Sequence, residues 1–127
     1  MLNPDQLLTP EESAQVDGAL MTNKEKFGTR ISIYSLRVLK QISAQKGIRA
    51  EAIAPSDLHE FVESQEQLVS ATGMTIDSEF KGFWANLVLS SRKQLEQIAT
   101  ANSKTLRDVT VRETIAWFET KSEEIHT

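Results

Sequence analysis

A pattern that repeats after 56 residues constrains the fold of this chain more than any other feature of its sequence. The stretch LKQIS, which begins at Leu39, returns as LEQIA at Leu95. Six of the 37 residue pairs that begin at positions 27–63 are identical, whereas average residue usage would give about two. The sequence therefore predicts two copies of one structural unit, which are too few for a solenoid.

The order of charged residues repeats at the same interval. Positions 22–49 hold seven basic residues and one acidic residue, and positions 50–80 hold seven acidic residues and no basic one. Positions 81–112 again favour basic residues, by six to two, and positions 113–127 favour acidic residues, by four to one. Each unit is therefore predicted to contain a long basic segment followed by a short acidic one.

Apolar residues in both long segments recur at the period of an α-helix. In the first segment, Phe27, Ile31, Tyr34, Val38 and Ile42 follow one another at spacings of three or four residues. Positions 80–98 show much the same spacing in the second segment. We expect these residues to form the core-facing side of two long helices.

The shorter helices are recognised by the residues that begin them. Thr9 and Glu12 form one capping-box pattern, Thr110 and Glu113 form another, and Pro55 occupies the first position of a third helix. Val16 and Leu20 are expected to face inward from the first of these helices. We predict five helices, at about 10–21, 25–46, 55–68, 78–101 and 110–125.

These elements predict an all-α fold. A short N-terminal helix is followed by two duplicated long-plus-short helical hairpins that pack as a compact bundle. Residues 1–127 are expected to form a single domain, with unit 1 at about 25–68 and unit 2 at about 78–125. The turn-forming residues at 70–78 are the expected linker.

Composition excludes several functional classes. The chain has no cysteine, which excludes disulfides, thiolate nucleophiles and cysteine-based metal sites. A formal net charge of −4 disfavours a dedicated nucleic-acid-binding domain. Neither a signal peptide nor a membrane-spanning run of apolar residues is present, so we expect a soluble, cytoplasmic protein that does not associate with a membrane.

The sequence contains no recognisable catalytic or cofactor-binding motif. Its five glycines are scattered, and with only two histidines, His59 and His126, it has few candidates for a metal site or a catalytic triad. We therefore expect no enzymatic activity, no cofactor and no metal. A small-molecule site between the long helices, with polar groups from Tyr34, Trp84 and His59, is a remaining alternative.

Three apolar residues lie away from the main apolar face of their helices. Ile33 and Leu36 are in the first long segment, and Leu89 is at the position equivalent to Ile33 in the second. Apolar residues in such positions require a cover, which is either the other long helix or a partner protein. The three residues are the candidate partner-binding surface.

Four basic residues form a separate stripe beside the apolar face of the first long segment. Lys26, Arg30, Arg37 and Lys40 fall within roughly 80° of one another on an ideal helix. The stripe either forms ion pairs with the acidic short helix of its own or the other unit, or binds an anionic partner, including the phosphates of a nucleic acid. The ion pairs are the favoured interpretation.

The functional hypothesis is a non-enzymatic helical protein-interaction module, either an adaptor or a regulatory protein. Its expected partners are another protein, a second copy of the same chain, or both. A nucleic-acid-binding protein that uses the basic stripe is the alternative hypothesis.

Overall fold

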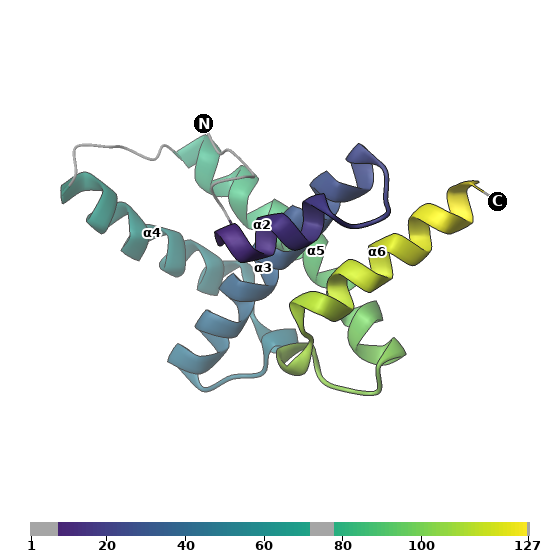
Figure 1. Cartoon of the computed structure of the whole chain (residues 1–127). Coiled ribbons are helices and arrows are strands. Elements are labelled where there is room, and N and C mark those ends of the chain that lie inside the picture. Colours follow the sequence, from purple (N-terminus) through teal and green to yellow (C-terminus); the bar gives the residue numbers. More distant parts are fainter. Residues whose placement is uncertain (1–7, 72–77, 127) are drawn as a thin grey trace.

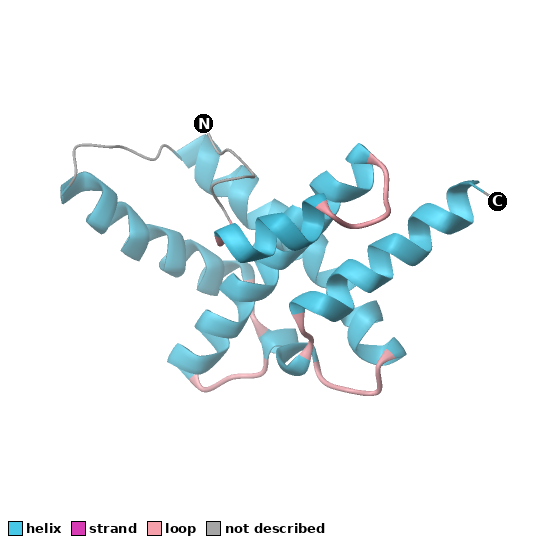
Figure 2. Ribbon diagram, viewed as in Figure 1, coloured by secondary structure: helices cyan, strands magenta, loops and turns pink. Residues whose placement is uncertain are grey.

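The all-α fold is confirmed by a computed structural model, which describes residues 8–71 and 78–126, with side chains at 8–64, 79 and 81–122 (Figures 1 and 2). Within these ranges there are five α-helices, two short 3₁₀ helices and no strand. They are α2 (Pro10–Asp17), α3 (Asn23–Lys46), η1 (Ala50–Ala52), α4 (Pro55–Ala71), α5 (Ser78–Ala101), η2 (Leu106–Asp108) and α6 (Val111–His126). The two 3₁₀ helices were not predicted.

Side-chain caps fix where helices begin. The Thr9 hydroxyl accepts the backbone N–H of Glu12 at 3.2 Å, while the Glu12 carboxylate accepts the N–H of Thr9 at 3.0 Å. Thr110 and Glu113 exchange the equivalent bonds, at 3.1 and 2.9 Å, before α6. These bonds satisfy N–H groups that have no partner within the helix, and they confirm both predicted capping boxes.

The first helix is shorter than predicted. It ends at Asp17 instead of Met21, and the N–H of Gly18 closes it by donating to carbonyl groups of the last turn. Leu20, predicted to face inward, lies beyond the helix and is 81% exposed. Glycine has a low helix propensity, which explains the early end.

The two long helices cross at the centre of the molecule, as Figure 1 shows. The short helix α4 lies beside the first half of α5, and α6 lies beside the first half of α3. Each short helix therefore packs chiefly against the long helix of the other predicted unit. The remaining helix, α2, contacts α3 and α6.

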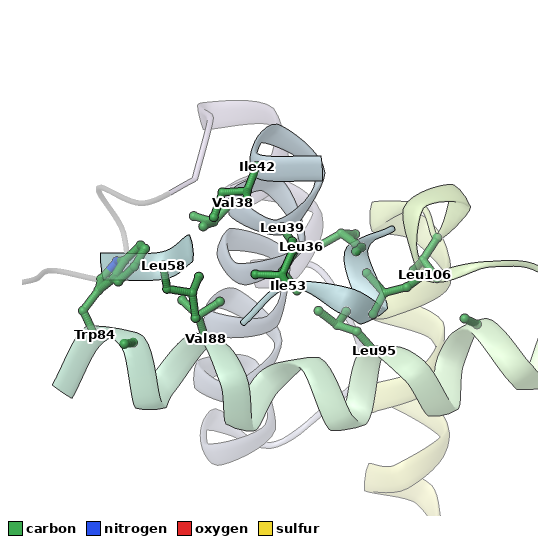
Figure 3. Packing of buried hydrophobic residues seen from close by; sticks show 14 of the residues in the cluster. Leu36, Val38, Leu39, Ile42, Ile53, Leu58, Trp84, Val88, Leu95 and Leu106 are labelled. Carbon is green, nitrogen blue, oxygen red and sulfur yellow. The ribbon is translucent and has the colours of Figure 1, made fainter. Parts of the chain in front are cut away.

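The main core lies where the long helices meet (Figure 3). Leu39 and Leu95, the first residues of the two repeated stretches, are both 0% exposed. Ile42 and Ile98, three residues further along, are buried in the same cluster. The repeated sequence thus supplies equivalent core positions in two helices, with a specific role in packing.

Local structure recurs at the sequence interval of 56 residues. The 3₁₀ helices begin at Ala50 and Leu106, and in both cases two residues separate the end of the 3₁₀ helix from the start of the next α-helix. The long helices are followed by residues with positive φ, Gly47 at 64° and Ser103 at 55°. This agreement supports the duplication, which stays a prediction. The division into two units and the single domain also stay predictions. Most of the expected linker, at 72–77, lies outside the described residues.

The apolar face predicted for the long helices does not extend to their beginnings. Phe27 is 54% exposed and Phe83, its equivalent in α5, is 59% exposed. The buried side of α3 begins only at Thr29, beyond the first turn. The prediction that these two aromatic rings face the core was therefore wrong, because a periodic pattern shows which side of a helix is apolar and does not show how far the core extends along it.

Candidate interaction surfaces

The three candidate partner-binding residues have different environments. Ile33 is 1% exposed and lies in a second apolar cluster with Val16 of α2 and Ile115 of α6. Leu36 is 2% exposed in the main core. Leu89 is half-buried at the edge of that core. The chain itself therefore covers Ile33 and Leu36, and only Leu89 keeps an accessible side that a partner can contact.

The basic stripe of α3 is occupied largely by α2. The Lys26 ammonium group donates to the backbone carbonyl of Asp17 at 2.9 Å, and the Arg30 guanidinium forms an ion pair with the carboxylate of the same residue. Arg37 forms an ion pair with Glu12. The acidic helix α2 thus lies along the basic side of α3, as the favoured interpretation of the stripe required, although the partner helix is not the one expected.

The fourth stripe residue, Lys40, faces a different part of the chain. Its ammonium group donates to the carbonyl of Val109 at 2.7 Å, just before α6. Burial lowers the pKa of Lys40, and the nearby carboxylates of Asp108 and Glu113 oppose that change. All four stripe residues thus have partners within the chain, which a nucleic-acid phosphate would have to displace.

The contact between Glu12 and Arg37 has a clear electrostatic signature. Partial burial acts to raise the pKa of Glu12, but the hydrogen bond and charge of Arg37, together with the N–H of Thr9, outweigh it and lower the pKa below its usual value. The carboxylate is therefore ionised where α2 meets α3. This ion pair, the contacts that Asp17 makes with α3 and the burial of Val16 together hold α2 in place.

Further ion pairs join each long helix to the short acidic helix of its own unit. Lys46 at the end of α3 contacts Asp57 at 2.6 Å and also contacts Glu60. Lys104 after α5 contacts Glu113 at 2.9 Å. These pairs lower the pKa of Asp57 and of Glu113 and raise that of Lys46.

Two of the three polar residues proposed for a small-molecule site bond to each other, and the third lies apart from them on the surface. The indole N–H of Trp84 donates to the Tyr34 hydroxyl at 2.9 Å, and the Trp84 ring stacks on Phe61 with 5.9 Å between centroids. His59 is exposed, and the side chain of His126 lies outside the described residues. Among the described side chains, no group of three or more acidic, histidine or cysteine residues could hold a metal ion.

Two open grooves lie elsewhere on the surface. One, of about 270 Å³, lies between the η1 region and η2, with Arg49 and Arg107 in its lining. The other, of about 370 Å³, lies between the end of α2 and α6, with Ile115 and Arg112 in its lining. Neither groove brings together the candidate residues of the sequence analysis.

The outer side of α5 presents residues that sequence reasoning did not select. Asn86 and Lys93 are exposed on either side of Leu89 along this helix, and Phe83 lies one turn before Asn86. The signal that identifies Lys93 is its position, 56 residues after Arg37. We refer to Asn86, Leu89 and Lys93 as the outer face of α5.

Comparison with models of known protein families gives a match over most of the chain. The family described as NDH complex assembly factor CRR9 matches residues 8–124, a range that contains every described element except the last residues of α6. Comparison with curated proteins and with solved structures finds no match. None of the described helices combines the length and the apolar composition needed to cross a membrane.

Proposed function

The chain belongs to the family of NDH complex assembly factor CRR9, and on that premise we propose that it assists the assembly of an NDH complex by binding protein components of that complex, without catalysing a reaction. The observation that carries this proposal is the extent of the family match. Residues 8–124 include both long helices and the core between them. The similarity therefore involves the entire helical scaffold instead of one short motif.

The structure supports a binding role through the way its polar groups are used. The four basic residues of the stripe on α3 contact acidic or carbonyl groups of the same chain, and Trp84 donates a hydrogen bond to Tyr34. Such contacts stabilise a scaffold. The accessible apolar side chains, which include Phe27 and Phe83, are then available for contacts with other proteins.

Removal of the protein from its source cells tests this function. We expect the fully assembled NDH complex to decrease strongly on native gels, with partial complexes or free subunits in its place. Re-expression of the wild-type chain is the control and should restore the full complex. A normal amount of fully assembled, active NDH complex in cells that lack the protein would contradict the proposal.

Self-association is a separate prediction of the sequence analysis. Light scattering on the purified chain measures the molar mass of the particle in solution, and 14.2 kDa is the mass of one copy. A mass that stays at this value across the concentrations found in the cell would contradict self-association and would leave the assembly function unaffected.

A further inference from the structure

The helix α2 occupies a surface on α3 whose equivalent on α5 is more exposed. On α3, Val16 of α2 packs in the cluster that contains Ile33, and Glu12 pairs with Arg37. The contact thus includes an apolar residue and a carboxylate that lie four residues apart on the docked helix, besides the contacts that Asp17 makes with Lys26 and Arg30. In the predicted duplication, α2 has no counterpart of its own before α5.

The residues that receive α2 have counterparts 56 positions further along. Leu89 corresponds to Ile33, and Lys93 corresponds to Arg37, so an apolar residue and a basic residue recur at the same spacing. On an ideal helix, Asn86, Leu89 and Lys93 lie within about 60° of one another and form one face. The outer face of α5 therefore repeats the apolar residue and the basic residue that receive Val16 and Glu12, whereas Asn86 stands where α3 has Arg30.

The accessibility of the two surfaces differs. Ile33 is 1% exposed beneath α2 and α6, whereas Leu89 is only half-buried. Lys93 and Asn86 are both exposed. An aromatic ring, that of Phe83, is 59% exposed one turn before Asn86 and extends the apolar part of this surface.

We propose that the outer face of α5 binds an acidic helix from a protein component of the NDH complex in the manner in which α2 binds α3. This inference rests on the proposed function and specifies its binding surface. The bound helix carries a carboxylate that pairs with Lys93 and, four residues later, an apolar side chain that covers Leu89, as Glu12 and Val16 do on α3. Complementary charge selects this partner, because an acidic helix neutralises Lys93 and a basic helix would be repelled.

A charge reversal on this face tests the proposal with purified subunits of the NDH complex as probes. The variant Lys93→Glu changes an exposed residue, and Lys24→Glu makes the same change at an exposed residue in the first turn of α3. We expect the wild-type chain and Lys24→Glu to bind one subunit equally, and Lys93→Glu to bind it at least about tenfold more weakly. Circular dichroism melting curves should be the same for all three proteins.

A photo-reactive residue in place of Asn86 identifies the bound segment. We expect it to cross-link to an acidic helix of the subunit. In that helix, replacement of the acidic residue that pairs with Lys93 by lysine should restore the binding of Lys93→Glu. Equal binding by Lys93→Glu and Lys24→Glu would overturn the proposal, as would a cross-link to a second copy of this chain, to a basic segment or to nucleic acid.

The failure of this surface is distinguishable from the failure of the proposed function. If removal of the protein blocks NDH assembly while cells that express Lys93→Glu assemble the complex normally, the surface proposal is wrong and the function stands. If removal of the protein has no effect on assembly, the function itself is wrong.

Discussion

Replacement of the leucines that begin the two repeated stretches tests whether they fill equivalent core positions. Leu39 in α3 and Leu95 in α5 are both 0% exposed and belong to one apolar cluster. Leu39→Ala and Leu95→Ala should therefore destabilise the protein by similar amounts. Leu20→Ala is the control, because Leu20 is 81% exposed and makes little contact with the core.

The expected magnitude follows from the atoms removed. A change from leucine to alanine deletes three carbon atoms, each worth about 0.8 kcal/mol when transferred out of water, or about 2.4 kcal/mol in total. The cavity left in a tightly packed core adds to this cost, which gives about 3 kcal/mol for each variant. Domains of this size unfold with about 5–15 kcal/mol, so each variant would lose a large part of the stability of the protein.

Urea denaturation, followed by tryptophan fluorescence and circular dichroism, measures these free energies of unfolding. Trp84 is 3% exposed within the same cluster, so its fluorescence reports on the integrity of the core. Leu20→Ala should stay within about 0.5 kcal/mol of the wild type. A cost below about 1 kcal/mol for either core variant, or a difference above about 2 kcal/mol between the two, would refute the reasoning.

Three further predictions concern α2, the core hydrogen bond and two glycines. The pKa of Glu12 in the folded protein is lowered from 4.5, so its ionised carboxylate stabilises the fold above pH 4.5, and this stabilisation is lost as the pH falls through the folded-state pKa. On acid titration, Glu12→Gln should therefore lose less free energy of unfolding than the wild type. An equal loss would exclude the ion pair as a cause. Tyr34→Phe leaves the buried N–H of Trp84 without an acceptor and should cost about 1–2 kcal/mol in urea denaturation, whereas no measurable cost would argue against this bond. Gly82→Ala adds a methyl group that meets no atom within 4 Å, and because alanine favours a helix it should raise stability by up to about 1 kcal/mol. Gly47→Ala places a side chain at a φ of +64° and should lower stability by about 1 kcal/mol. The midpoints of thermal melting should therefore shift in opposite directions.

The beginnings of the helices could be predicted because capping is a local interaction. Thr9 with Glu12, and Thr110 with Glu113, are each separated by three residues, so the sequence contains both partners within one short window. The burial of Val38 and Ile42 was predictable for a similar reason, since helical periodicity identifies an apolar side from neighbouring positions. The 3₁₀ helices were not predictable in this way, because three residues are too few to show a period.

The candidate site was harder to predict because its partners come from distant parts of the chain. Arg37 pairs with Glu12 across 25 residues, and Ile33 is covered jointly by α2 and α6. The sequence shows that a basic stripe and an extra apolar residue need partners and does not show which element supplies them. The exposure of Phe27 was missed because the core ends before the helix does.

The turn between α2 and α3 is held by α6 through two hydrogen bonds that span nearly the whole chain. The N–H of Leu20 donates to Glu119 at 3.0 Å, across 99 residues, and the N–H of Thr22 donates to Ser122 at 3.1 Å, across 100 residues. During synthesis, the segment that becomes α2 therefore leaves the ribosome long before the helix that anchors it. These two bonds can therefore form only when nearly all of this sequence has been made, and a chain interrupted before α6 would hold α2 by its contacts with α3 alone.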